Sequence, residues 1–336
     1  MDRSPAAVET HISQVFFTED RAYKLLKPVK TGFLDFADRE RRLDAANREL
    51  RLNRRLAPDV YLGLANVWEE GDLVDHLIVM RRLPSRRRLA TLLASARTAS
   101  PAAGSIPAGD QGSATPGAVS ECLIQVARAV ASLHLSAPGL AGGAASMATR
   151  DAVARNWDAN FATIADFVGR VIDPAEYEEV ARLAGDYLEA GAELFQHRID
   201  GGWIRDGHGD LRAEDIFCLD DGPRILDCLA FSDDLRIADV LNDIAFLVMD
   251  LHHLSGSHLA DELMEVYLSF TGEVHPASLA HHYVAYRAHV GVRVACLEME
   301  GGDPSKAAEA AALHGLALRQ LELAASAVAI TGPDRS

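Results

Sequence analysis

The 336-residue sequence lacks an excess of positive charge: it has 33 Lys and Arg against 49 Asp and Glu, a formal net charge of −16. This balance argues against nucleic acid or an anionic membrane as the main partner, because both select basic surfaces. No apolar run approaches the roughly 20 residues that a membrane span needs, and no basic region followed by an apolar segment opens the chain. We therefore expect a cytoplasmic protein that does not act at a membrane.

Cysteine is scarce, and its spacing carries no motif. The chain has four cysteines, none of them in a C-x-x-C arrangement, so the sequence suggests neither a zinc site nor a redox pair. Cys218 and Cys228 lie in an apolar segment and are expected to be small core residues. The histidines of the last third lack the companion ligands of a metal motif, which favours packing or solvated roles for them.

One stretch, from Gly207 to Cys228, gathers three acids. Asp210 follows His208-Gly209, and Asp215 precedes a short β-rich run that meets strong turn residues and returns to Asp227. If the two runs pair as an antiparallel hairpin, Asp215 and Asp227 lie at its open end, and Asp210 lies on the loop that leads there. Converging carboxylates repel one another unless a cation lies among them, and such oxygen ligands suit Mg²⁺.

The N-terminal segment predicts antiparallel strands and one long helix. Two strands are expected within residues 9–28, a helix over 36–57, and two further strands over 61–67 and 73–80. The chain after residue 119 is predicted to be mostly helical, with a single helix over 174–197 among its elements.

Glu49 is an exception on the apolar face of the predicted helix 36–57. It shares that face with alanine and leucine side chains, and a carboxylate in such a place needs a cation or hydrogen-bond donors. An arginine on the same helix, such as Arg42 or Arg54, is one candidate partner, and a cation from another element is the alternative.

These motifs resemble the aminoglycoside phosphotransferase family, which shares the protein-kinase fold. The resemblance rests on His208-Gly209-Asp210 with the acids at 215 and 227, on Ala22-Tyr23-Lys24 and on the segment from Glu49 to Pro58, and it extends over nearly the whole chain. It points to a less characterised branch whose substrates are largely unassigned. The implied fold is α+β and two-lobed, protein-kinase-like, with an N-lobe of sheet and helix over 1–83 and a mainly helical C-lobe over 84–336. Residues 96–118, rich in Ala, Ser, Gly and Pro, read as a flexible insertion.

The resemblance also implies roles for the acids and the lysine. Asp210 would be the catalytic base that accepts the proton of the attacking hydroxyl. Asp227 would hold Mg²⁺ against the phosphates of ATP or GTP, and Asp215 stands at the second metal-ligand position, where the family usually has Asn. Lys24, braced by Glu49, would meet the α- and β-phosphates.

Other positions follow from the kinase layout. Lys27 is the alternative phosphate lysine, and since it is three positions from Lys24, only one of them faces the nucleotide on a regular strand. No Gly-rich loop precedes the first hairpin, so Ser13 is the candidate phosphate donor there. Met80 to Leu83 form the expected hinge beside the adenine. Asp239 is the expected brace of the catalytic loop.

The predicted function is transfer of the γ-phosphoryl of ATP or GTP to a hydroxyl of a small molecule. An aminoglycoside or amino sugar would suit the acids Asp233, Asp234 and Asp250. Two alternatives stay open. A non-catalytic nucleotide-binding protein would explain the missing Gly-rich loop and Asp215, whereas a protein kinase is disfavoured because no A-P-E segment follows Asp227.

Overall fold

The computed structural model describes residues 7–10, 12–30, 34–98 and 116–330. The chain forms two compact units, Met1–Ala129 with His208–Arg236, and Val130–Gly207 with Ile237–Ser336. The predicted division at residue 83 falls inside the first unit and stays a prediction. Most of the predicted insertion, residues 99–115, lies outside the described residues, while its ends belong to helices.

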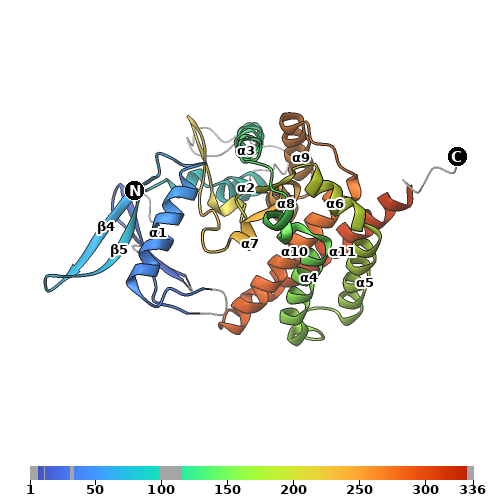
Figure 1. Cartoon of the computed structure of the whole chain (residues 1–336), viewed down its shortest axis with the longest axis horizontal. Coiled ribbons are helices and arrows are strands. Elements are labelled where there is room, and N and C mark those ends of the chain that lie inside the picture. The colour runs from blue at the N-terminus through green and yellow to red at the C-terminus, as the bar shows by residue number, and fades with distance from the viewer. Residues whose placement is uncertain (1–6, 11, 31–33, 99–115, 331–336) are drawn as a thin grey trace. The chain divides into compact units, whose positions relative to one another are not determined.

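The first unit is built on an antiparallel sheet of five strands in the order β1-β2-β3-β5-β4 (Figure 1). The four predicted strands are confirmed, and a short additional strand pairs with the first of them. In chain order, the strands are β1 Ala7–Glu9, β2 Ser13–Phe17, β3 Arg21–Leu26, β4 Tyr61–Glu69 and β5 Asp72–Arg81.

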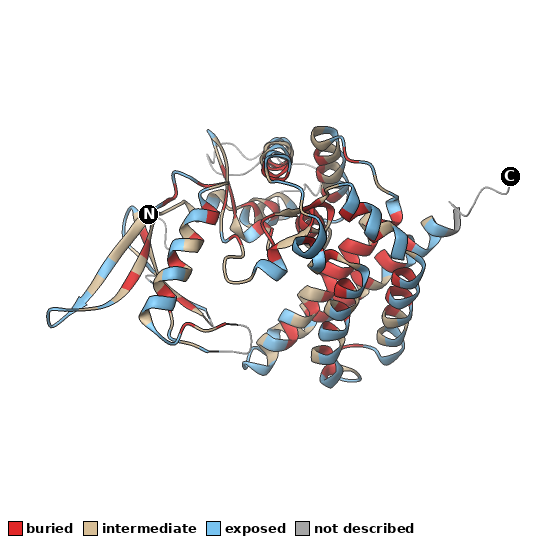
Figure 2. Cartoon of the chain, viewed as in Figure 1, coloured by how far each residue is buried: buried red, intermediate tan, exposed pale blue. Residues whose placement is uncertain are grey.

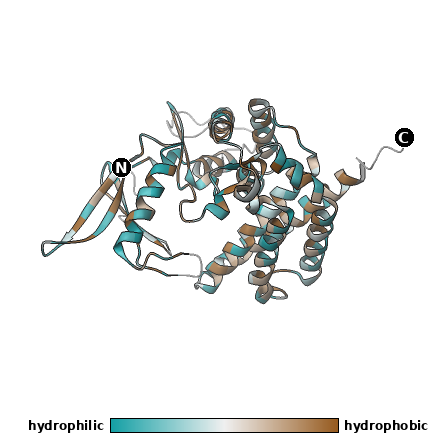
Figure 3. Ribbon diagram, viewed as in Figure 1, coloured by the Kyte–Doolittle hydropathy of each residue, from teal (hydrophilic) through white to brown (hydrophobic). Residues whose placement is uncertain are grey.

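Helix α1, Arg39–Asn53, packs against β4 and β5. It is shorter than the predicted helix 36–57 because the Asp38 side chain caps its N-terminus by accepting a hydrogen bond from the Arg41 amide. Figure 3 shows that α1 is largely hydrophilic. Its burial against the sheet is therefore confined to a few positions, and Glu49 is one of them.

The remaining elements of the first unit carry the acid-rich stretch. The predicted hairpin is present, with Ile216 paired to Ile225 and Leu219 paired to Gly222. A 3-10 turn brings the chain into the hairpin, and a short helix follows it. These elements are η1 Ser85–Arg87, α2 Leu89–Thr98, the first part of α3 Pro116–Ser136, η4 Ala213–Asp215, β7 Ile216–Leu219, β8 Gly222–Ile225 and α7 Asp233–Arg236.

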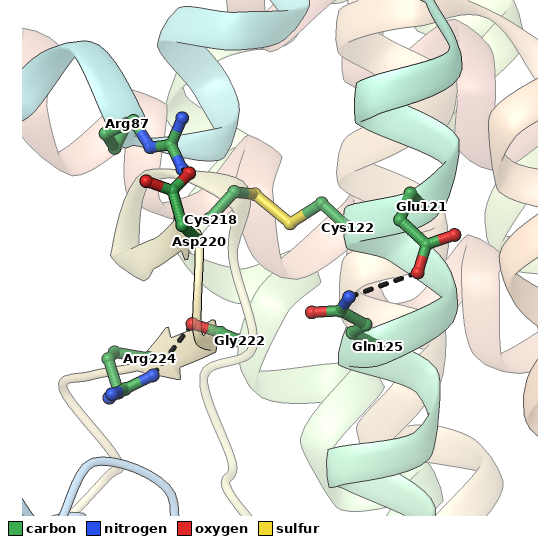
Figure 4. The surroundings of a disulfide bond; sticks show 8 residues. All are labelled: Arg87, Glu121, Cys122, Gln125, Cys218, Asp220, Gly222 and Arg224. Carbon is green, nitrogen blue, oxygen red and sulfur yellow. Dashed lines mark hydrogen bonds and ion pairs between the residues drawn. A yellow bond between two sulfur atoms is a disulfide. The ribbon is translucent and has the colours of Figure 1, made fainter.

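A disulfide joins the hairpin to α3, contrary to the expectation of unpaired cysteines. Cys218 on β7 bonds Cys122 on α3, and the two residues are 96 positions apart in the sequence (Figure 4). The spacing of cysteines in a sequence does not reveal such a pair, because it forms only once the hairpin lies beside the helix. Cys228 and Cys296 are buried and take no part in this disulfide.

The second unit is helical apart from one two-stranded ladder, as expected for this part of the chain. Its buried residues concentrate on α8 and α10, which pack against each other (Figure 2). The elements are η2 Gly142–Ala148, α4 Arg150–Ile164, η3 Ala165–Phe167, α5 Pro174–Ala190, α6 Ala192–Asp200, β6 Ile204–Asp206, β9 Ile237–Asp239, α8 Val240–Ser255, α9 Ser257–Thr271, α10 Ala277–Glu300, η5 Pro304–Lys306 and α11 Ala307–Ile330.

Two expectations about helices are wrong. The predicted helix 174–197 is two helices, α5 and α6, which meet at Gly191, where a Cβ atom would lie 2.9 Å from the Tyr187 carbonyl oxygen. The expectation that no apolar run approaches the length of a membrane span also needs correction. Within the described residues, Gly117–Ser136 of α3 is long and apolar enough to cross a membrane, but half of it is buried, and a core helix has the same properties.

Candidate active site

Lys24 is shared by two carboxylates in the first unit. Its Nζ lies 2.8 Å from Glu49 Oε1 and 2.8 Å from Asp227 Oδ1. The predicted pairing of Lys24 with Glu49 is thus confirmed, and the alternatives on the helix are excluded. Arg42 pairs with Asp75, and the guanidinium of Arg54 donates to backbone carbonyl oxygens at the start of β4.

The electrostatics of this trio keep Lys24 charged. Burial alone would lower the pKa of Lys24, but the carboxylates of Asp227 and Glu49 outweigh it and raise that pKa well above its usual range. The charge of Lys24 in turn lowers the pKa of Asp227. Burial raises the pKa of Glu49 even though Lys24 opposes this. The ammonium of Lys24 is therefore a fixed positive charge held beside an ionised Asp227.

The hairpin brings Asp215 close to Asp227 as predicted. Asp215 ends the 3-10 turn before β7, and its carbonyl oxygen accepts a hydrogen bond of 2.9 Å from the Leu226 amide at the end of β8. Desolvation, followed by repulsion from Asp227, Glu214 and Asp210, raises the pKa of Asp215 well above its usual range. Asp210, half-buried on the preceding loop, thus belongs to the same electrostatic neighbourhood.

The three acids do not form a closed metal cage. Across the described ranges, no group of three or more His, Cys, Asp or Glu side chains is arranged to hold a metal ion, so the expectation that Asp210, Asp215 and Asp227 surround one ion is not met. Asp227 is instead paired with Lys24. Mg²⁺ in phosphoryl-transfer sites uses one or two carboxylates plus phosphate oxygens and water. Asp215 and Asp227 repel each other and supply two neighbouring carboxyl groups, which is the number of protein ligands that such a Mg²⁺ ion uses.

Lys27 has other partners. It lies just beyond β3 and pairs with Glu9, and it also donates to the carbonyl oxygen of Thr10, at the turn between β1 and β2. The structure therefore favours Lys24 among the two lysines. The Ser13 hydroxyl is buried and bonded to Thr10 Oγ1 at 2.9 Å, so its role toward a phosphate stays a prediction.

The predicted hinge follows β5. The Met80 side chain is buried in the core of the sheet, and Leu83 packs against the same core. These contacts place both side chains in the packing of the first unit. The contact between this backbone and an adenine stays a prediction.

Tyr61 and Asn53 are the site residues that sequence reasoning missed. The Tyr61 hydroxyl accepts a hydrogen bond of 3.3 Å from the Asp227 amide, and Asn53 Oδ1 accepts one of 2.9 Å from the Cys228 amide. Asn53 follows Glu49 by four positions and so shares its helix face, a signal that could have been used. Nothing in the strand pattern distinguishes the Tyr61 hydroxyl from an ordinary core tyrosine.

Within the second unit, Asp243 rather than Asp239 lies against the backbone that enters the catalytic loop. A Cβ atom on Gly207 would lie 2.3 Å from Asp243 Oδ2, so only glycine fits there. Asp243 also forms a hydrogen bond of 2.9 Å with His134 Nε2, so each of these two buried polar side chains has a partner. Asp239 instead makes a two-pronged ion pair with Arg198, with both contacts at 2.7 Å.

The acids suggested for a cationic acceptor have different surroundings. Asp233 is paired with Arg48 of α1 and with Arg236, so its carboxylate is already neutralised. Asp250 is 7 % exposed within α8. Asp234 is exposed. The sequence suggested three carboxylates available to a cationic acceptor, and these three acids do not all provide one.

Solved structures with a similar fold include several small-molecule kinases. A choline kinase from Cryptosporidium parvum matches with a TM-score of 0.51 at 11 % identity, over 96 % of this chain and 88 % of that one. A glucosamine kinase matches with a TM-score of 0.51 at 16 % identity, over 94 % and 75 % of the two chains. A choline/ethanolamine kinase family protein from Mesorhizobium loti matches with a TM-score of 0.50 at 15 % identity, over 99 % and 90 %.

The chain has the two-lobed protein-kinase-like fold. The predicted fold class is thereby confirmed, and the resemblance stated from the motifs holds at the level of the fold. No protein-family model matches the sequence. Relatives that are 35 % identical over 326 residues, or 96 % of this chain, are uncharacterised proteins of Mycobacterium tuberculosis and Mycobacterium bovis. The chain spans 61 % of the length of these relatives.

Proposed function

We propose that this kinase-like chain transfers the γ-phosphoryl group of ATP or GTP to a hydroxyl of a small molecule. The observation that carries the proposal is the trio of Lys24, Glu49 and Asp227, joined by two contacts of 2.8 Å. A strand lysine held between a helix glutamate and a hairpin acid is the arrangement that kinases use to grip nucleotide phosphates.

Each residue has a role in the proposed reaction. Lys24 orients the α- and β-phosphates, and Glu49 holds the lysine in place. Asp215 and Asp227 would hold Mg²⁺, which supplies neutralisation of the phosphate charge. Asp210 orients the acceptor hydroxyl and takes its proton as the oxygen attacks phosphorus. Phosphoryl transfer asks little covalent chemistry of the protein, so this positioning is most of its work.

The acceptor is proposed by class only. The three similar solved structures mentioned above are described as kinases of choline, ethanolamine or glucosamine, which carry a hydroxyl and a nitrogen that is positively charged at neutral pH. The net charge of −16 is compatible with a cationic acceptor of this kind. We therefore propose amino alcohols, amino sugars and aminoglycosides as the first compounds to assay.

Replacement of Asp210 tests the proposal. Asp210→Asn should lower the rate of phosphate transfer by a factor of about 100 or more, the usual contribution of a general base, with little change in nucleotide affinity. Glu193→Gln is the control, because Glu193 is an exposed acid on α6 that has no part in the proposed site. The assay measures transfer of labelled γ-phosphate from ATP and from GTP to each acceptor with and without Mg²⁺.

Two results would count against the proposal. An undiminished rate in Asp210→Asn would remove the base assignment. Nucleotide binding by the wild-type protein without transfer to any acceptor or to water would instead favour a non-catalytic nucleotide-binding protein. That second candidate is suggested by Asp215, whose raised pKa marks a site with more negative charge than the usual asparagine would give.

A further inference from the structure

Asp227 has a left-handed backbone conformation, which is uncommon outside glycine although Asp adopts it more readily than most residues. Its φ is +62°, in the left-handed region that residues other than glycine rarely adopt. Its side chain is 55 % exposed, so close packing does not hold it. The position of its carboxylate therefore depends on the pairing with Lys24 and on whatever fixes the backbone.

Two side chains from different elements fix that backbone. The amides of Asp227 and Cys228 donate to Tyr61 of β4 at 3.3 Å and to Asn53 of α1 at 2.9 Å. The Asn53 side chain is anchored in turn, because its Nδ2 donates to the Glu49 carbonyl oxygen at 3.0 Å. The left-handed turn is thus tied to the same strand and helix that enclose Lys24.

The hydroxyl of Tyr61 has no role in core packing. Tyr61 is 2 % exposed, and a phenylalanine would fill the same space. Burial, with the nearby carboxylates of Glu49 and Asp227, raises the pKa of Tyr61 well above its usual range. The hydroxyl is therefore a neutral, fixed acceptor for the Asp227 amide, and it lies close to the charged groups of the site.

We propose that Tyr61 is a positioning residue whose hydroxyl holds the left-handed turn at Asp227 and so keeps the Asp227 carboxylate directed at Lys24 and at the metal of the nucleotide. The part of this inference that concerns the metal rests on the proposed function. Without the hydroxyl, the Asp227 amide loses its partner in a desolvated place, and the turn can relax toward ordinary negative φ. The carboxylate would then leave the position that two elements now define.

The test compares Tyr61→Phe with Tyr23→Phe. Tyr23 precedes Lys24 on β3 and so points to the opposite face of the sheet, which makes it a matched control. The first measurement is amide hydrogen exchange in the peptide that contains Asp227 and Cys228. We expect about tenfold faster exchange in Tyr61→Phe only, the effect of losing one hydrogen bond.

The second measurement is ADP affinity by calorimetry with and without Mg²⁺. Tyr61→Phe should weaken Mg²⁺-ADP binding about tenfold, as expected when a group that supports a metal ligand is lost. Binding of metal-free ADP should not change. If Mg²⁺ changed the ADP affinity of Tyr61→Phe and of Tyr23→Phe equally, the metal-positioning role of Tyr61 would be overturned. If hydrogen exchange at Asp227 and Cys228 were unchanged in Tyr61→Phe, the whole inference would be overturned. If the wild-type protein bound no nucleotide, the proposed function would fail, and hydrogen exchange would still decide whether Tyr61 holds the turn.

Discussion

Two buried histidines determine how the second unit responds to acid. His282 and His289 lie on α10 and are fully buried among aromatic rings. The His282 ring stacks on Tyr187 with 4.4 Å between centroids, and the His289 ring lies 4.9 Å from that of Trp157. Within the described residues, neither nitrogen of either ring has a hydrogen-bond partner. Burial lowers the pKa of each to about 3.

The sign of the effect follows from proton binding. In the unfolded chain a histidine titrates near pH 6.5, whereas in the folded protein these two stay neutral down to about pH 3. Between these values the unfolded state binds more protons, so stability falls as the pH falls below 6.5 and is level above it. A pH of 5 lies about 1.5 units below the pKa of a histidine in the unfolded chain. At 1.36 kcal/mol per unit, each of the two histidines therefore lowers the free energy of unfolding by about 2 kcal/mol at this pH.

The predicted loss is large compared with the stability of a typical domain. About 4 kcal/mol from the two histidines would be a sizeable part of the roughly 5–15 kcal/mol that holds such a domain folded. His282→Phe removes one titrating group, keeps an aromatic ring against Tyr187, and removes two nitrogens that lack partners. We expect this variant to lose about 2 kcal/mol less than the wild type between pH 8 and pH 5.

The assay is urea unfolding followed by tryptophan fluorescence at pH 8 and pH 5. His258→Phe is the control, because His258 is an exposed histidine on α9. Equal losses in His282→Phe and wild type would refute the reasoning. So would a nuclear magnetic resonance titration in which His282 of the folded protein takes up its proton near pH 6.5.

Two further predictions concern stability. The substitution Gly207→Ala places a methyl carbon 2.3 Å from Asp243 Oδ2 and should lower the free energy of unfolding by about 2–3 kcal/mol. Urea unfolding measures this loss, and a change below about 0.5 kcal/mol would contradict the close approach. Reduction of the Cys122–Cys218 disulfide, whose cysteines are 96 positions apart, should destabilise the first unit by about 3 kcal/mol. A melting temperature insensitive to reductant would show that the bond contributes nothing.

The features predicted correctly from sequence depend on local patterns. The hairpin from Ile216 to Ile225 needed only a β-rich run on each side of strong turn residues. Lys24 and Glu49 could be paired because a carboxylate on an apolar helix face needs a cation, and the resemblance to the kinase layout pointed to the strand lysine. A local rule was thus sufficient for the hairpin, whereas the resemblance supplied the partner in the ion pair.

The features that were missed depend on long-range contacts or on competition between partners. The bond between Cys122 and Cys218 depends on how α3 lies beside the hairpin, which no spacing rule encodes. Asp239 and Asp243 are both acids at the start of one helix. Only the buried Arg198 shows that Asp239 is already paired. Sequence reasoning identified the right type of residue and chose the wrong one.

The charges around Asp227 bear on how a metal ion could bind. Lys24 contacts the carboxylates of Glu49 and Asp227, and the charge of Asp227, with those of Glu214 and Asp210, raises the pKa of Asp215. A nucleotide triphosphate would bring more negative charge to this place, so the proposed function requires a divalent ion to accompany it. The ion would enter with the phosphates rather than wait in a preformed cage, because Mg²⁺ takes much of its coordination from phosphate oxygens and water. An acceptor that is itself anionic would face the same repulsion, which is why neutral or cationic alcohols are the better fit.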